Sequence, residues 1–185
     1  MRVIAGKVKG LHLKTPKAGW RVRPLTDQAR GALFNILAEK VGDSSFLDLF
    51  AGTGAVGIEA LSRGAQVAIF VEMNRQVVAL IRQNLELTGF TDRAEVYAVD
   101  VLKAVNILSG KGAKFGIIFI GAPYDSPLLD KVLQKIADGG LLAPAGVLIA
   151  EHRKQHELAV EYGKLQMFRA ARYGETVFEF YKEKA

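Results

Sequence analysis

The stretch that decides the fold reads Phe46-Leu-Asp-Leu-Phe-Ala-Gly-Thr-Gly-Ala-Val-Gly57. Its apolar start predicts a buried strand, its glycines predict a tight turn, and helical spacing begins at Val56. Gly52, Gly54 and Gly57 let the backbone turn sharply or approach a ligand closely. A strand, a glycine turn and a helix in this order are typical of nucleotide-binding units. The pattern alone leaves a turn without a ligand as the alternative.

Asp48 lies inside this otherwise apolar strand. An unpaired carboxylate is costly to bury, so a polar partner must meet it. We expect that partner to be a set of backbone N–H groups or the donors of a ligand.

Strand-like and helix-like segments alternate outward from this stretch. The expected strands are 46–50, 67–71, 94–99, 115–120 and 146–150, and the expected helices are 28–40, 56–63, 74–88, 101–108 and 127–138. This order predicts an α/β fold, a doubly wound and mostly parallel sheet with helices on both faces. The tail adds an expected β-pair, 165–171 with 177–181. Ligands of such sheets bind beyond the carboxyl ends of the strands.

Length and composition limit the functional class. A chain of 185 residues, half of them hydrophobic, fits one ordinary domain with a sizeable core. No apolar run reaches the roughly 18 residues that a membrane span needs. The absence of cysteine excludes disulfides and thiolate metal sites, and no group of His, Asp and Glu is spaced as a metal site. We expect a cytoplasmic monomer without a membrane partner.

Positive charge is concentrated at the N-terminus. Residues 1–30 hold eight Lys and Arg against one acid, whereas the remaining 155 residues hold 17 Lys and Arg against 18 Asp and Glu. We expect a basic hairpin and loop over residues 1–24, with strands at 2–5 and 11–15, ahead of a main domain over residues 25–185. Such an arm favours a polyanion, most simply nucleic acid, over a purely solubilising role. The candidate contacts are Arg2, Lys7, Lys9, Lys14, Arg21, Arg23 and Arg30.

Acidic residues stand at or near the ends of three expected strands. Glu72 comes 20 residues after Gly52, where a carboxylate suits the hydroxyls of a ribose. Asp100 could meet the amino group of a purine, or it could simply cap the next helix. A nicotinamide cofactor would explain Asp48 and Glu72 but not Asp100 so readily.

These motifs, in order, resemble those of class I S-adenosylmethionine-dependent methyltransferases. More closely, the chain resembles the RsmD-type methyltransferases, which methylate the exocyclic N2 of one guanine in bacterial small-subunit (16S) ribosomal RNA. The resemblance covers nearly the whole chain. The segments that carry it are Met1-Arg-Val-Ile-Ala-Gly-Lys7, Arg23-Pro-Leu-Thr-Asp27, Arg30-Gly-Ala-Leu-Phe-Asn-Ile-Leu37, Asp48–Gly57, Gly57-Ile-Glu-Ala-Leu-Ser-Arg-Gly-Ala65, Phe70-Val-Glu-Met-Asn74, Asn84-Leu85, Val99-Asp-Val101, Glu151-His152 and Arg172-Tyr-Gly-Glu-Thr176.

The resemblance implies roles for individual residues. Asp48, Gly52, Thr53 and Gly54 would line the methionine part of S-adenosylmethionine. Glu72 would bind its ribose, and Asp100 with Val101 would bind its adenine. Arg23, Thr26 and Arg30 would lie at the mouth of the site, and the basic hairpin would contact RNA phosphates.

The chain departs from the family in its reactive motif. The family has Asp or Asn, then Pro-Pro-Tyr, after the fourth strand, whereas this chain has Gly121-Ala122-Pro123-Tyr124. In the family picture, the acid and the next carbonyl accept the hydrogens of the target amine. Tyr124 keeps a ring that can stack on the base and Ala122 keeps its carbonyl, but Gly121 has no side-chain acceptor. Losing one such contact typically slows a reaction about 10²- to 10³-fold.

Three functions therefore remain open from the sequence. The leading one is methylation of a guanine N2 in small-subunit ribosomal RNA. The second is a non-catalytic RNA-binding protein that retains the fold, which the glycine at 121 motivates. The third is an adenine-N6 methyltransferase, because that chemistry uses a similar final motif.

Overall fold

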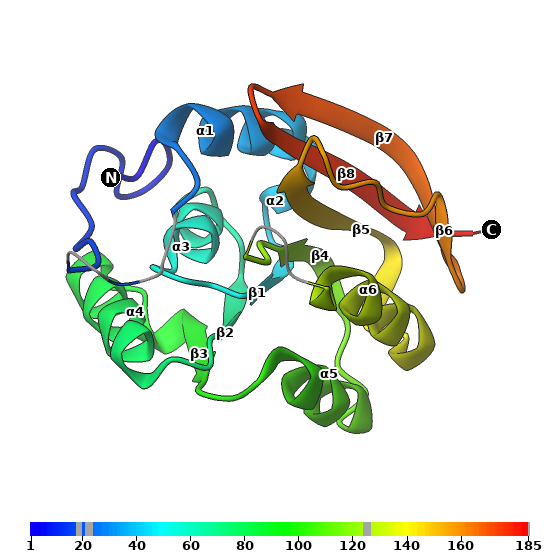
Figure 1. Ribbon diagram of the computed structural model, residues 1–185. Coiled ribbons are helices and arrows are strands. Elements are labelled where there is room, and N and C mark those ends of the chain that lie inside the picture. Colours follow the sequence, from blue (N-terminus) through cyan, green and yellow to red (C-terminus); the bar gives the residue numbers. More distant parts are fainter. Residues whose placement is uncertain (18–19, 21–23, 124–126, 185) are drawn as a thin grey trace.

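The computed structural model describes residues 1–17, 20, 24–123 and 127–184 and centres on one sheet (Figure 1). The sheet has eight strands in the order β3-β2-β1-β4-β5-β8-β7-β6. The strands are β1 Ser45–Leu49, β2 Val67–Val71, β3 Ala94–Tyr97, β4 Phe115–Ile120, β5 Leu142–Arg153, β6 Glu161–Tyr162, β7 Leu165–Tyr173 and β8 Thr176–Glu183. Strands β1 to β5 pair in parallel, whereas β8, β7 and β6 continue the sheet antiparallel. The predicted α/β fold is confirmed.

Helices cover both faces of this sheet (Figure 1). They are α1 Asp27–Ile36, α2 Ala38–Val41, α3 Ala55–Ser62, α4 Arg75–Thr88, α5 Val101–Gly110 and α6 Leu128–Gly139, with a 3₁₀ turn η1 at Thr91–Arg93. Buried side chains of α1 to α4 share one core cluster, and those of α5 and α6 share the other. In the described part of the chain, no helix is long and apolar enough to cross a membrane.

Side-chain alternation divides the strands between these two clusters. Phe46, Ile117, Phe119 and Ile149 face the cluster of α1 to α4, and their immediate neighbours face α5 and α6. Because alternate side chains of a strand point to the same face, residues 48, 121 and 151 continue the first set. The alternation of side chains along the strands therefore places these three positions on the same face of the sheet, at its carboxyl edge.

The expected helix 28–40 is divided in two. Thr26 caps its start by accepting a hydrogen bond from Ala29 N at 3.2 Å. The helix breaks at Leu37, and α2 then continues for one turn. Leu37 and Val41 both lie in the core, so the break keeps the two side chains buried.

The expected N-terminal strands are reduced to an isolated antiparallel bridge between Arg2 and His12. The side chains of two helices bind the backbone groups that a hairpin would have used. Glu59 accepts from Ile4 N at 2.8 Å and from Ala5 N at 3.0 Å. Asn84 accepts from Lys14 N at 2.8 Å and donates to Lys14 O at 3.2 Å. The segment is thus attached to α3 and α4, while its own pairing is limited to backbone hydrogen bonds such as Val3 N to Leu11 O at 2.9 Å and Leu13 N to Met1 O at 3.2 Å.

Candidate active site

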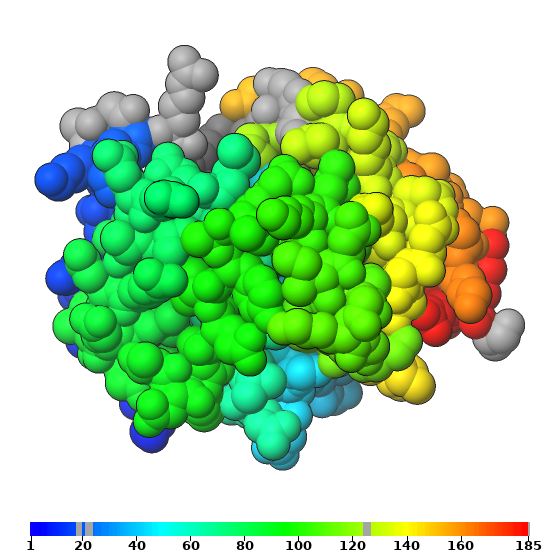
Figure 2. Space-filling model, turned by 90° about the horizontal axis from the view of Figure 1, so that it is seen from below, coloured from blue at the N-terminus to red at the C-terminus, as the bar shows by residue number. Residues whose placement is uncertain are grey.

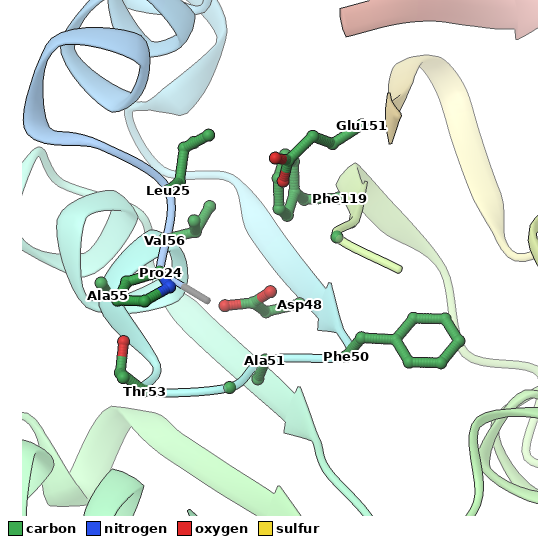
Figure 3. A pocket seen from close by; sticks show the side chains of 12 residues that line it. Pro24, Leu25, Asp48, Phe50, Ala51, Thr53, Ala55, Val56, Phe119 and Glu151 are labelled. Carbon is green, nitrogen blue, oxygen red and sulfur yellow. The ribbon is translucent and has the colours of Figure 1, made fainter. Parts of the chain in front are cut away.

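A pocket opens at the carboxyl ends of β1, β4 and β5, beside the glycine turn (Figure 3). Its lining brings together residues that are far apart in the sequence. They are Pro24, Leu25, Asp48, Phe50, Ala51, Gly52, Thr53, Ala55, Val56, Phe119, Gly121 and Glu151. The predicted position of the site, beyond the strand ends, therefore coincides with a pocket.

Asp48 forms the acidic floor of this pocket and is only 1% exposed. Its Oδ2 accepts a hydrogen bond from Gly57 N at 2.9 Å, which is the kind of backbone partner expected from the sequence. Burial raises the pKa of Asp48 from 3.8 to about 7, and repulsion from Glu151 and Glu72 adds to the increase, against the lowering effect of the Gly57 bond. A positively charged partner in the pocket would therefore favour the ionised form of Asp48.

The glycine turn owes its glycines to two different constraints. Gly54 adopts a left-handed conformation with φ of 76° at the start of α3, where other residues would be strained. At Gly57, a Cβ would lie 2.4 Å from Cε1 of Phe70. Gly57 is thus required by the packing of α3 on β2, whereas Gly52 and Thr53 line the pocket.

Glu72 connects the end of β2 to the glycine turn. Its Oε2 accepts from Gly52 N at 3.2 Å and its Oε1 from Asn74 N at 2.8 Å. Further along the same edge, Asp100 caps α5 by accepting from Leu102 N at 2.9 Å. The capping alternative for Asp100 is therefore observed, and a role with adenine stays a prediction.

The reactive-motif segment begins directly after β4. Gly121 N donates to Leu49 O at 3.1 Å, which holds the segment against β1. Ala122 is buried in the cluster of α5 and α6, and Pro123 is exposed. Tyr124 lies outside the described residues.

The pocket is acidic on its described walls. Asp48 and Glu151 are its charged lining residues, and no Lys or Arg stands among the described residues that form it. Figure 3 shows both side chains among those that line the pocket. Such a donor set suits a ligand that carries positive charge.

The predicted RNA contacts have different environments. Arg2, Lys7, Lys9 and Lys14 are exposed on the N-terminal segment, which Figure 2 shows in blue at the edge opposite the C-terminal strands. Arg21 and Arg23 lie outside the described residues.

The prediction that Arg30 contacts RNA is wrong, because its side chain is fully buried and unavailable to RNA. Its Nη2 donates to Asp27 Oδ1 at 2.9 Å and to the carbonyl of Arg2. Its Nε lies 3.7 Å from Oε2 of Glu59. Arg30 therefore attaches the N-terminal segment to α1 from inside the protein.

Sequence reasoning missed three polar residues that build the site. Glu59 and Asn84 are fully buried and hold the N-terminal segment, and Asn84 also donates to Thr53 O of the glycine turn at 3.1 Å. The sequence did contain a sign of the role of Glu59, because it is a charged residue within an otherwise apolar helix. Glu151 follows the apolar run of the fifth strand, as Glu72 follows the second, so strand-end acids pointed to it too.

The fold and the acidic pocket define a class I methyltransferase. The solved structure of the methyltransferase yhhF from Escherichia coli superposes with a TM-score of 0.86 at 32% identity, over 100% of this chain and 98% of that one. YlbH of Bacillus subtilis (strain 168), named as an rRNA methyltransferase, is 36% identical over all of both chains. Ribosomal RNA small subunit methyltransferase D of Escherichia coli (strain K12) is 32% identical over 100% of this chain and 91% of its own length.

The family itself follows from these matches. The chain belongs to the RsmD family of methyltransferases, because the family model described as Conserved hypothetical protein 95 matches residues 1–182.

Proposed function

We propose that the protein transfers a methyl group from S-adenosylmethionine to the exocyclic N2 of a guanine in small-subunit ribosomal RNA. The observation that best supports S-adenosylmethionine as the cofactor is the acidic pocket at Asp48, beside the glycine turn. The names of the relatives, which refer to ribosomal RNA and to the small subunit, support the substrate half.

The cofactor chemistry fits the residues present. S-adenosylmethionine supplies a methyl group on a positively charged sulfonium and also carries an ammonium group. Asp48 would stabilise that positive charge from the pocket floor, with Gly52 and Thr53 of the lining, and Gly54 of the same turn, around the methionine end. Glu72 would accept from the ribose, and Asp100 with Val101 would contact the adenine.

The proposal that the protein binds RNA rests on the basic N-terminal segment. Arg2, Lys7, Lys9 and Lys14 are exposed cations suited to phosphates. Asn84 bonds both to Lys14 and to Thr53 O, so the basic segment and the glycine turn share one side chain. That link favours an RNA strand that crosses the pocket mouth.

The target amine needs acceptors because its lone pair is delocalised into the guanine ring. The carbonyl of Ala122 would accept one hydrogen, and the ring of Tyr124 would stack on the base. Pro123 would hold the segment between them in one conformation.

The test is methyl transfer by the purified protein, assayed as a monomer after size-exclusion chromatography. Labelled S-adenosylmethionine is incubated with small subunits from cells that lack the enzyme, and with large subunits as the control. We expect label in the small-subunit RNA only. Absence of label at stoichiometric enzyme would overturn the proposal and favour a non-catalytic RNA-binding role.

A further inference from the structure

Glu151 lies on the face and at the level of the reactive motif. Strands β4 and β5 pair in parallel, with Phe119 opposite Ile149 and Ile120 opposite Ala150. The next position on each strand is Gly121 and Glu151. Because side chains alternate, both positions face the pocket that Phe119 also lines (Figure 3).

The carboxylate of Glu151 reaches toward the space that a side chain at position 121 would enter. A Cβ built on Gly121 would lie 3.5 Å from Oε2 of Glu151 and 3.0 Å from Cε1 of Phe119. A side chain added at position 121 would thus contact both the carboxylate of Glu151 and the ring of Phe119. The site is packed around glycine, with an acid from the neighbouring strand beside it.

We propose that Glu151 is a catalytic residue that accepts a hydrogen of the target amine in place of an acid at position 121. This inference rests on the proposed methyl transfer. Glu151 is half-buried and lines the same pocket as Asp48 and Gly121, so its carboxylate borders the space proposed for the amine and the methyl donor. Its negative charge also contributes to the raised pKa of Asp48, which is consistent with this proximity.

The chemical step requires an acceptor in this position. The amine nitrogen forms the new N–C bond while the S–C bond of the methyl donor breaks, and that electron pair stays on sulfur. Positive charge develops on nitrogen, and a carboxylate directed at it lowers the barrier. The proton released from nitrogen passes to Glu151 and from there to water at the pocket mouth.

The experiment compares four proteins on the same RNA: the wild type, Glu151→Gln, Gly121→Asp and the double variant. Glu151→Gln should lower kcat about 10²- to 10³-fold, the range for losing one preorganised contact. Gly121→Asp alone should change kcat less than about tenfold, because Glu151 already accepts the hydrogen. The double variant should regain at least about tenfold over Glu151→Gln, since position 121 then supplies the acid that position 151 has lost.

Controls separate catalysis from folding. Glu175→Gln, in the turn between β7 and β8, should leave kcat unchanged. Thermal unfolding and the Kd for S-adenosylhomocysteine are measured for each variant, so a loss confined to kcat identifies the chemical step. If Glu151→Gln does not fold, Glu151→Asp, which keeps the charge on a shorter side chain, takes its place alone and with Gly121→Asp.

Three outcomes would overturn the inference. A wild type that transfers methyl groups while Glu151→Gln keeps its kcat would remove Glu151 from the reaction and leave the proposed function intact. A tenfold gain from Gly121→Asp alone would mean that position 121 is a defect and not a replaced acid. A wild type without any transfer would fail the proposed function first, and this role of Glu151 with it.

Discussion

At the residue scale, Asp48 couples the pocket to pH. Its folded pKa of about 7 exceeds the unfolded value of 3.8, so the folded protein holds a proton that the unfolded chain releases between these values. The contribution of Asp48 to stability is therefore full below pH 3.8, declines by up to about 1.4 kcal/mol per pH unit between the two pKa values, and is lost above pH 7. A cationic ligand that favours the ionised form should bind better above pH 7.

The raised pKa of Asp48 gives a direct prediction for ligand binding. The rise in Tm caused by a fixed excess of S-adenosylmethionine should be larger at pH 8 than at pH 5.5, because Asp48 is ionised only at the higher pH. Asp48→Asn should weaken binding and remove most of this pH dependence. Differential scanning fluorimetry measures both, with Glu39→Gln on the exposed side of α2 as the control. Equal shifts at both pH values would contradict the account.

A second residue-scale prediction concerns Gly57. Gly57→Ala places a methyl group 2.4 Å from the Phe70 ring, so the helix or the ring must move. Overpacking of this kind typically costs about 1 to 3 kcal/mol. Gly110→Ala, at the end of α5 with open space around it, is the matched control and should change stability little. Urea unfolding of the two variants compares the costs, and equal midpoints would show that the packing at Gly57 is not strict.

At the element scale, helix α3 holds the N-terminal segment through Glu59 and Ser62. Glu59 accepts from two backbone N–H groups and pairs with Arg63 Nε at 2.7 Å. Ser62 O accepts from Lys7 N at 2.7 Å, and a Cβ at Gly6 would lie only 1.9 Å from that oxygen. The basic segment is thus built onto a helix that begins at the glycine turn.

Glu59→Gln should release this attachment. The substitution removes the carboxylate that accepts from Ile4 N and Ala5 N, and a hydrogen bond to a charged group contributes about 1.5 to 3 kcal/mol. Urea unfolding should report the loss, and limited proteolysis should show faster cleavage within residues 1–17. Glu86→Gln, exposed on α4, is the control for charge removal on a helix. Unchanged cleavage would mean that the segment is held by its apolar contacts at Val3 and Leu13 instead.

The sequence predicted the elements of the central sheet well, for a physical reason. Continuous apolar runs such as 115–120 and the period of the helix 74–88 record burial directly, so β4 and α4 appear within a residue of their expected places. The hairpin at 2–5 and 11–15 was different. Its backbone groups bind the side chains of Glu59 and Asn84, and local sequence does not reveal a partner more than 50 residues away.

The same distinction explains the candidate site. Asp48 and Glu72 were found because they stand at or near strand ends, where topology alone brings residues together, whereas Gly121 was found through the family's reactive motif. Arg30 was misassigned to RNA because a charge count does not distinguish an exposed arginine from one that is buried against a carboxylate. Glu151 needed the register of β4 against β5 before its relation to Gly121 could be seen.

At the scale of the whole molecule, charge is segregated. The N-terminal segment with its cations lies at one edge of the protein (Figure 2), and the acidic pocket lies at the carboxyl ends of the central strands (Figure 3). This arrangement attracts a polyanion to the segment and a cation to the pocket. An RNA methyltransferase must bind both at once.

Salt dependence tests the basic segment. Replacing Lys7, Lys9 and Lys14 by alanine should weaken RNA binding and reduce the slope of log K against log salt by about 2 to 3, since each phosphate contact contributes roughly 0.7 to 0.9. The matched control replaces three exposed lysines elsewhere, Lys103, Lys131 and Lys164. Equal slopes for both triple variants would show that binding depends on net charge alone.

The central claim is that the pocket at Asp48 carries methyl transfer to a guanine N2. Its most direct test is mass-spectrometric identification of the methylated nucleoside in small-subunit RNA after incubation with the protein and S-adenosylmethionine. The account predicts N2-methylguanosine, formed by the wild type and strongly reduced with Asp48→Asn. N6-methyladenosine, or no methylated nucleoside at all, would contradict it.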